Sequence, residues 1–424
     1  MSVLSVTSTE SGTDRIRPQM TESLAAACGT SRPWLTRAAQ TLVLSRLNQM
    51  TDGQILLDDQ CDRTVLGHTA DDGLQANVTV HNPTFYRRLA TGGSLGLAES
   101  FMDGEWSCDD LPALIRIFCR NLHRFQGGWL QQAGRSAARV GHWLSRNTKE
   151  GSRRNIGAHY DLGNDFFSLF LDPSMMYSSA IYPTPQSTLE DAQRYRMNEV
   201  CRQLDLQPHD HLLEIGTGWG GMAIYAAQNY GCRVTTTTIS RQQYEYAVAK
   251  VAAAGLQDQV TVLLEDYRDL NGRYDKLVSL EMIEAVGPQF YDTYFQRCGE
   301  LLKPDGRLLI QAIVMPEQRY EGYLKSVDFI QKYIFPGGSL PSVAAMQDCA
   351  TRKTSLRMLA LNDFADGYAR TLREWRRRFH QKLEQVREQG YSERFIRMWD
   401  YYLCYCEAAF DERSVGVVHA VWGR

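Results

Sequence analysis

The sequence predicts an α/β protein in which a doubly wound parallel sheet follows a smaller α+β domain. Three observations predict this fold class. An apolar run ends in a glycine-dense turn at residues 211–227 and then continues with helical spacing. Strands and helices alternate after that turn, whereas residues 33–147 hold short strands and helical pieces without a second such turn. At 424 residues, the chain is long enough for more than one domain.

The glycine-dense turn, HLLEIGTGWGGMAIYAA, predicts a strand, a tight loop and a helix. Leu212, Leu213 and Ile215 form the buried end of the strand. The glycines at 216, 218, 220 and 221 let the backbone approach a ligand without a Cβ in the way, and the first amides of the helix face the same loop. Such a unit holds a nucleotide-like ligand at the carboxyl end of a parallel strand.

The residues around this loop favour S-adenosylmethionine (SAM) over a dinucleotide. A dinucleotide site has an acidic residue at the end of the next strand, about 20 residues on. Here that strand is RVTTTTIS, at residues 233–240, and it contains no carboxylate. Glu214 instead stands just before the first glycine, as in the E/D-x-G-x-G-x-G loop of class I SAM methyltransferases.

The remaining parallel strands are expected at residues 233–240, 259–264, 274–280 and 307–314, with a helix at 242–254. Ligands of such sheets lie outside the carboxyl ends of the strands. The polar residues at these ends are Glu214, Ser240, Asp266, Glu284 and Gln311. Asp266 and Ser240 also suit turn and helix caps, and Glu281 with Glu284 suits an acid pair at a helix N-terminus. Their convergence on one edge favours a ligand site.

The N-terminal part divides into a tail and a domain. Residues 1–32 are expected to be a disordered tail, because the first nineteen are rich in Ser, Thr and Gly and lack the pattern of a targeting peptide. Residues 33–147 form the smaller domain. It has a helix at 35–47, strands at 54–58, 63–68 and 74–80, and helical pieces at 85–89, 97–102 and 111–122. Residues 148–424 form the domain with the glycine loop.

Basic and aromatic residues alternate between Arg116 and Arg154, with Glu150 as the only acid. One interpretation is a solvated basic helix followed by a linker. The other is a surface for anionic phospholipid headgroups, to which each base contributes about 1 kcal/mol. A nucleic-acid partner is not expected, because no binding fold with stacking aromatics can be made out.

Composition sets further bounds. With 43% hydrophobic and 22% charged residues and a net charge of −3, the chain is an ordinary globular protein. Its ten cysteines show no C-x-x-C spacing, so we expect reduced, mostly buried thiols in a cytoplasmic protein and no metal site. No run of about 18 apolar residues indicates a membrane span, although the chain could lie on a membrane.

Five longer motifs extend the comparison beyond the glycine loop. They are NIGAHYDLGNDFFSLFLDPSMMYSSAIY (155–182), LLEIGTGWGG (212–221), LEMIEAVGPQFYDTYF (280–295), YIFPGGSLP (333–341) and YSERFIRMWDYYLCYCEAAF (391–410). Together they resemble the cyclopropane-fatty-acyl-phospholipid synthase family over nearly the whole chain. The resemblance implies a Rossmann-like SAM methyltransferase domain that adds a methyl carbon to an acyl-chain double bond. It also implies an N-terminal domain that helps to engage lipid.

The resemblance further implies roles for individual residues. The cofactor-binding set comprises Tyr177, Ser178, Glu214, Gly216, Gly218, Thr238, Gln243, Asp266 and Tyr267. Tyr177 and Ser178 with the two glycines would hold the methionine end, Thr238 and Gln243 would reach the ribose side, and Asp266 with Tyr267 would contact the adenine. The catalytic set comprises Glu284, Tyr368, Ser179 and Gln311. In the family a bicarbonate is bound by a cysteine, a glutamate, a histidine and a tyrosine. Ser179 stands at the cysteine position and Gln311 at the histidine position, which leaves the base open and makes bicarbonate a candidate second ligand.

The chemistry defines what such residues must do. An alkene attacks the sulfonium methyl once the two are aligned, which leaves a carbocation that aromatic faces and a carboxylate stabilise. Proton loss from the new methyl closes a cyclopropane ring, and loss from a neighbouring carbon leaves a branched chain. We expect Glu284, as the only carboxylate that we can place there, to orient a bicarbonate with Ser179, Gln311 and Tyr368; the alternative is that Glu284 is itself the base.

The sequence therefore predicts a SAM-dependent methyltransferase that acts on unsaturated acyl chains of phospholipids. Cyclopropanation is the first expectation and a methyl- or methylene-branched product the second. A SAM-binding protein without catalysis and a methyltransferase of soluble small molecules remain alternatives. The expected partner is a phospholipid bilayer, with the protein cytoplasmic and peripheral at the inner membrane surface, and a homodimer is left open.

Overall fold

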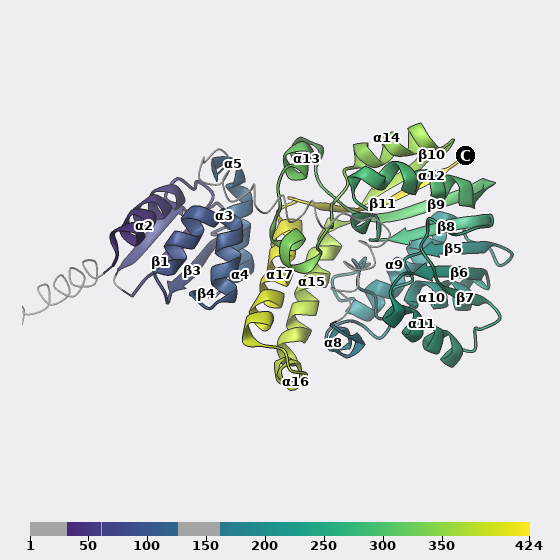
Figure 1. The fold of residues 1–424 in the computed structure, drawn as a ribbon, viewed down its shortest axis with the longest axis horizontal. Helices are drawn as coiled ribbons and strands as arrows, with labels where there is room; N and C mark the ends of the chain where they lie inside the picture. Colours follow the sequence, from purple (N-terminus) through teal and green to yellow (C-terminus); the bar gives the residue numbers. More distant parts are fainter. Residues whose placement is uncertain (1–31, 61, 126–161) are drawn as a thin grey trace, which may run out of the picture.

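The computed structural model describes residues 32–60, 62–125 and 162–424. The predicted tail, except for residue 32, and the predicted basic surface beyond residue 125 lie outside these ranges. Figure 1 shows two sheets, one at each side of the molecule, with C-terminal helices between them. Within the described ranges, no helix combines the length and the apolar character needed to cross a bilayer.

The N-terminal part consists of helices packed on a four-stranded sheet (Figure 1). Its elements are α2 (Trp34–Leu47), β1 (Gly53–Asp58), β2 (Arg63–His68), β3 (Gln75–Val80), α3 (Thr84–Met102), β4 (Trp106–Cys108), α4 (Leu111–Arg120) and α5 (Leu122–Phe125). The strand order is β2-β1-β3-β4, with β1 and β3 parallel. The two predicted helical pieces are one helix, α3, bent at Gly93, whose φ of 54° breaks the helical path. The three-residue strand β4 was not predicted.

The larger part contains a seven-stranded sheet of order β10-β11-β9-β8-β5-β6-β7. Its strands are β5 (His211–Ile215), β6 (Arg233–Thr238), β7 (Val260–Leu264), β8 (Tyr274–Leu280), β9 (Leu302–Val314), β10 (Arg357–Asp363) and β11 (Gly416–Gly423). The five strands from β5 to β9 run parallel, as predicted. The wholly parallel expectation needs a correction, because β11 pairs antiparallel with both β9 and β10.

Helices cover both faces of this sheet (Figure 1). The helical elements are α8 (Asn164–Ser168), α9 (Leu189–Leu204), α10 (Gly221–Tyr230), α11 (Arg241–Ala253), η1 (Ile283–Ala285), η2 (Pro288–Phe290), α12 (Tyr291–Leu301), α13 (Glu317–Leu324), η3 (Ile330–Ile334), α14 (Val343–Lys353), α15 (Ala365–Gln381), α16 (Leu383–Glu388) and α17 (Glu393–Asp411). Alternate strand residues enter different cores, as the pleat requires. Leu212 and Leu309 pack with α9 to α11, whereas Leu213 and Ile310 pack with α12 and α14.

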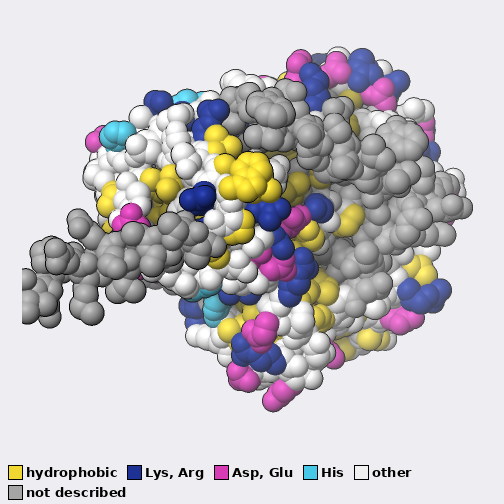
Figure 2. All heavy atoms as spheres, turned by 60° about the vertical axis from the view of Figure 1, so that its left-hand side comes forward, with side chains coloured by type: hydrophobic (Ala, Val, Ile, Leu, Met, Phe, Trp, Pro, Cys, Tyr) yellow, Lys and Arg dark blue, Asp and Glu magenta, His cyan; other side chains and the backbone are white. Residues whose placement is uncertain are grey.

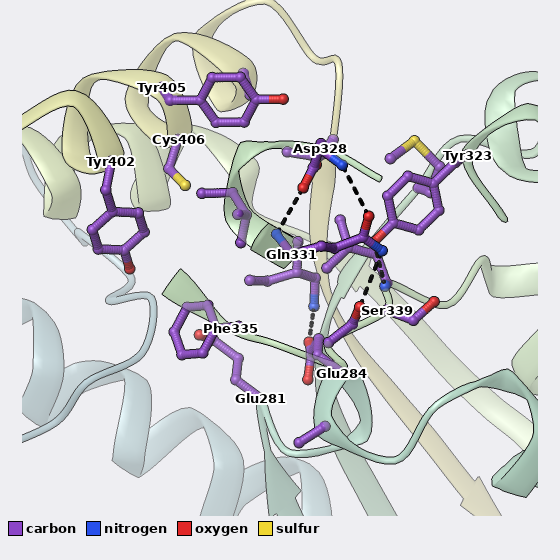
Figure 3. A pocket seen from close by; sticks show the side chains of 18 of the residues that line it. Glu281, Glu284, Tyr323, Asp328, Gln331, Phe335, Ser339, Tyr402, Tyr405 and Cys406 are labelled. Atoms are coloured by element: carbon purple, nitrogen blue, oxygen red, sulfur yellow. Dashed lines mark hydrogen bonds between the residues drawn. The ribbon is translucent and has the colours of Figure 1, made fainter. Parts of the chain in front are cut away.

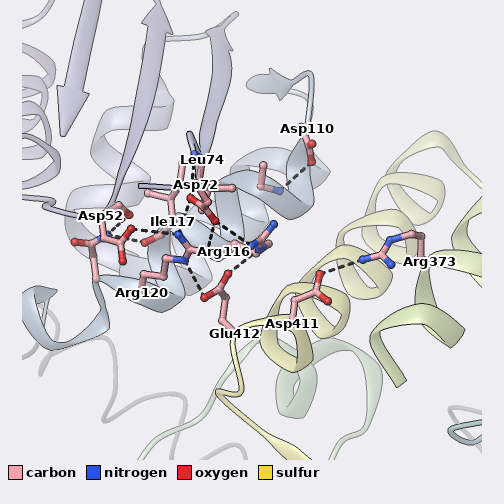
Figure 4. Close-up of polar contacts among 12 residues, drawn as sticks. Asp52, Asp72, Leu74, Asp110, Arg116, Ile117, Arg120, Arg373, Asp411 and Glu412 are labelled. Atoms are coloured by element: carbon pink, nitrogen blue, oxygen red, sulfur yellow. Dashed lines mark hydrogen bonds and ion pairs between the residues drawn. The ribbon is translucent and has the colours of Figure 1, made fainter. Parts of the chain in front are cut away.

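Ion pairs join the N-terminal part to the C-terminal helices. Arg116 and Arg120 on α4 both contact Glu412 after α17, at 2.7 and 2.9 Å, and Arg120 also binds Asp72 (Figure 4). On α3, Glu99 accepts from Lys332 at 2.6 Å. Arg116 and Arg120, which belong to the predicted headgroup surface, are therefore paired with carboxylates of the protein itself and are removed from that surface.

Candidate active site

The glycine loop forms a cradle at the carboxyl end of β5. Gly216, Gly218 and Gly220 have φ values of 100°, 52° and 87°, a region that L side chains rarely adopt. The amides of Gly216 and Thr217 both donate to the carbonyl of Thr237, at 3.0 Å, which ties the loop to the end of β6. A Cβ at position 218 would have no protein atom within 4 Å. The backbone there faces open space that a ligand can occupy.

That space is a cavity of about 1000 Å³. All nine predicted cofactor residues line it: Tyr177, Ser178, Glu214, Gly216, Gly218, Thr238, Gln243, Asp266 and Tyr267. The Thr238 hydroxyl donates to Gln243 Oε1 at 2.9 Å, and Asp266 is paired with Arg268 at 2.7 Å. Glu214 accepts from Thr236 at 2.6 Å, and burial raises the pKa of Glu214 to about 8. These residues fit SAM, because polar groups surround a glycine loop with room for a ligand.

Beyond the glycine loop, the cavity becomes apolar. Phe335, Leu372, Tyr402 and Phe410 line it there. Figure 3 shows Phe335 beside Glu281 and Glu284, with Tyr402 and Tyr405 on the neighbouring helix. The cavity then reaches α2, α3 and α4 of the N-terminal part. A polar end and a long apolar extension suit two ligands that meet near the two glutamates.

Glu281 is the carboxylate on which the predicted catalytic residues converge. Its Oε1 accepts from the amide of Ser179 at 2.8 Å and from Gln311 Nε2 at 2.7 Å, and its Oε2 accepts from the Tyr368 hydroxyl at 2.6 Å. Glu281 follows β8 directly with a φ of 51°, an uncommon value for a residue with a side chain. This turn aims the carboxylate at its three donors.

A buried cation balances this carboxylate. Arg196 on α9 is fully buried, and its Nη2 donates to Ser178 Oγ and Gln193 Oε1 at 3.1 and 2.9 Å. Burial lowers the pKa of Arg196 to about 10, so it stays charged near neutral pH. Burial also raises the pKa of Glu281, while the bonds from Tyr368, Ser179 and Gln311 and the charge of Arg196 oppose that rise. The net effect is a pKa of Glu281 above its ordinary value, and these three bonds and the charge of Arg196 are what favour the ionised carboxylate.

Glu284 has a different environment, which corrects the expectation that it is the only carboxylate here. Its Oε1 accepts from the amide of Ile313 at 2.6 Å, and its Oε2 is buried without a hydrogen-bond partner among the described residues. Burial, followed by the charge of Glu281, raises the pKa of Glu284 to about 8. Glu284 lines the cavity mainly as a neutral acid near pH 7. Glu281 was noticed in the sequence only as half of an acid pair.

Ser179 and Gln311 support Glu281 and do not face the cavity. Both are fully buried, and neither lines the cavity wall, whereas Glu281, Glu284 and Tyr368 do. Ser179, Gln311 and Tyr368, which the resemblance assigned to bicarbonate, therefore donate their hydrogen bonds to the carboxylate of Glu281. Bicarbonate does not fit between these residues, because their three donors are already bonded. The bicarbonate expectation is corrected on this ground.

A hydrogen-bonded relay behind Gln311 was not predicted. Gln203 Nε2 lies 3.1 Å from His419 Nδ1, and His419 Nε2 lies 2.9 Å from Gln311 Oε1. Because an amide nitrogen only donates, Nδ1 of His419 accepts and its Nε2 carries the proton. Burial lowers the pKa of His419 to about 3, so the ring is neutral. His419 thereby fixes the amide of Gln311 with its nitrogen toward Glu281.

Metal and disulfide chemistry find no support in the described ranges. No group of three or more His, Cys, Asp and Glu side chains there could hold a metal ion. The eight cysteines in these ranges are free thiols, and five of them are buried. The site is therefore built from carboxylates, amides and hydroxyls.

Comparisons with known proteins show which family the chain resembles. Residues 147–420 match the family model described as mycolic acid cyclopropane synthetase. The chain is 38% identical to the tuberculostearic acid methyltransferase UfaA1 of Mycobacterium tuberculosis, over 88% of this chain and 89% of that protein. It is 39% identical to the cyclopropane-fatty-acyl-phospholipid synthase of Escherichia coli, over 82% and 88%.

Solved structures show the same similarity. The cyclopropane synthase MmaA2 from Mycobacterium tuberculosis superposes with a TM-score of 0.60 at 28% identity, covering 64% of this chain and 98% of that one. The mycolic acid cyclopropane synthase CmaA1, solved with SAH and CTAB, gives a TM-score of 0.60 at 30% identity with the same coverage.

Proposed function

Because the chain belongs to the mycolic acid cyclopropane synthetase family and is a SAM-dependent methyltransferase, we propose that it methylates acyl-chain double bonds in membrane phospholipids. The product that we propose is a cyclopropane ring. The substrate is a bilayer lipid, so the protein works as a peripheral protein at the bilayer surface.

One observation carries this proposal. The carboxylate of Glu281 stands on the wall of a single cavity that is polar at the glycine loop and apolar beyond it. An apolar extension suits an acyl chain, and the polar end suits SAM. A carboxylate held between the two supplies the base that an alkene methylation needs and that neither serine nor glutamine can provide near neutral pH.

The residues of the site stabilise a carbocation and then accept a proton. SAM, when bound, supplies an electrophilic methyl group. Transfer of that methyl from the sulfonium sulfur to one alkene carbon would leave the neighbouring carbon cationic. Tyr177, Tyr368 and Tyr402 present aromatic rings to the cavity that stabilise this cation, together with the charge of Glu281. Glu281 then accepts a proton from the new methyl, and the released electron pair closes the ring.

A branched product is the second candidate, and the 38% identity to a tuberculostearic acid methyltransferase favours it. The same carboxylate serves both outcomes. A proton taken from the new methyl gives a ring, whereas a proton taken from a neighbouring chain carbon leaves a branch with a double bond. The two products have the same mass, so mass alone does not separate them.

The test is lipid analysis in a host that makes unsaturated but no cyclopropane acyl chains. Expression of the protein is expected to give phospholipid acyl chains heavier by one methylene group, without a site for ozone cleavage. A Gly218→Ala variant serves as the matched control. Heavier chains that ozone still cleaves would replace cyclopropanation with branching, and unchanged lipids would refute both.

A further inference from the structure

Helix α2 has an apolar outer face that the domain core does not use. Val43 and Leu47 are buried in the core, whereas the side chains of Trp34, Leu35 and Leu42 are 70%, 49% and 38% exposed. Residues four apart, or seven apart, lie on the same side of a helix. Trp34 and Leu42 are two such steps apart, and Leu35 and Leu42 are one step of seven apart. The three exposed side chains therefore lie on one side of α2, next to the side that faces the core.

This face also carries positive charge. Arg46 lies four residues after Leu42, on the same side of α2, and is exposed. Helix α2 contains no acidic residue, and no carboxylate of the described chain contacts the Arg46 guanidinium. Arg32, Arg63 and Arg88, in the same part of the protein, each contact an aspartate. Figure 2 brings this side of the molecule forward and shows hydrophobic side chains next to basic ones.

The outer face of α2 is continuous with the cavity. Leu42 and Arg46 are both exposed and both line the cavity, together with the buried Val43 and Leu47. The cavity passes the bend of α3 at Gly93 and continues to the glycine loop. An acyl chain that reaches Glu281 by this route has its headgroup at α2.

We propose that the outer face of α2 is the surface that docks on an anionic phospholipid bilayer. Trp34, Leu35 and Leu42 enter the interface between headgroups and acyl chains, and Arg46 binds the phosphate of the lipid whose chain fills the cavity. Exposed apolar side chains beside unpaired bases are what an interfacial helix requires. This inference rests on the proposed function, because it assumes that the substrate is a bilayer lipid.

The test uses the full chain and needs no SAM. Vesicles contain oleoyl phosphatidylglycerol and phosphatidylethanolamine, with a fraction of acyl chains brominated near the headgroup to quench tryptophan. Trp34 is the only exposed tryptophan of the described ranges. The difference in quenching between the wild type and Trp34→Phe therefore measures how far Trp34 contacts the brominated chains. We expect a clear loss of quenching in that variant. Equal quenching of the wild type and Trp34→Phe would overturn the proposal.

Vesicle sedimentation provides the second readout. Arg46→Gln is expected to weaken binding about fivefold, with a smaller effect at high salt, since one base near an anionic surface is removed. Leu42→Ser is expected to weaken binding as well. Val65→Ser is the matched control, because Val65 is 57% exposed on β2 and away from this face. Arg46→Gln and Leu42→Ser proteins that melt and bind like Val65→Ser would refute the docking surface.

These experiments distinguish a failure of the docking surface from a failure of the proposed function. If vesicles bind through α2 but the protein makes no modified lipid, the docking surface stands and the proposed reaction fails. If modified lipid is made while α2 variants bind normally, the reaction stands and the docking surface fails.

Discussion

Replacing Glu281 and Glu284 one at a time by glutamine separates two accounts of the base. Both side chains line the cavity, and both changes preserve size. We expect Glu281→Gln to abolish most turnover, because the carboxylate that receives the proton is removed. We expect Glu284→Gln to remain active within about threefold, because a neutral glutamate and a glutamine differ little.

The structure supplies the magnitudes. A positioned general base contributes a factor of about 100 to 10,000, so its loss raises the barrier by about 3 to 5 kcal/mol. With a pKa of about 8, Glu284 is roughly nine tenths protonated at pH 7. Glutamine at 284 can keep the bond from the Ile313 amide to its oxygen. The catalytic charge that Glu284→Gln removes is thus small.

The assay is kcat on oleoyl phospholipid in mixed micelles, with SAM affinity measured by calorimetry as a control for folding. Both variants are expected to bind SAM with wild-type affinity. A dead Glu284→Gln protein beside an active Glu281→Gln protein would refute the reasoning and restore Glu284 as the base.

Three further predictions concern the cavity and its support. Gly218→Ala places a methyl group in the open cavity, so SAM affinity is expected to fall at least tenfold in calorimetry, while the φ of 52° costs about 1 kcal/mol of stability. Tyr368→Phe removes a hydrogen bond that favours the ionised form of Glu281, so the pKa of Glu281 is expected to rise further. In a plot of kcat against pH, the region where kcat increases with pH then moves to higher pH. His419→Phe frees the Gln311 amide to turn, which is expected to lower kcat with the KM for SAM unchanged; a changed KM alone would contradict it.

The sequence predicted the five parallel strands β5 to β9 and missed β10 and β11. The run before Gly216 and the alternation after it indicate β5 to β9, because parallel strands buried on both faces are apolar runs. Strand β11 is equally apolar, but its antiparallel place between β9 and β10 follows from tertiary packing. The sequence predicted two separate helical pieces where α3 is one helix, because the bend at Gly93 interrupts the helical pattern between them.

The cavity lining was predictable from the loop and the family motifs, and the base was not. Glu281 and Glu284 are three residues apart after one strand, so the sequence does not decide which carboxylate meets Tyr368. The positive φ of Glu281 decides it. His419 lies 108 residues from Gln311, and only the pairing of β11 with β9 brings the two side chains together.

The most direct test of the central claim, that the Glu281 carboxylate is the base of this site, is turnover with and without bicarbonate in buffer freed of carbon dioxide. The account predicts that the wild type is indifferent to bicarbonate. It also predicts that Glu281→Ala is nearly inactive and is partly restored by formate or bicarbonate, which can bind the amide of Ser179, Gln311 and Tyr368 in place of the lost carboxylate. Wild-type turnover that falls when bicarbonate is removed, together with a Glu281→Ala protein that neither anion restores, would contradict it.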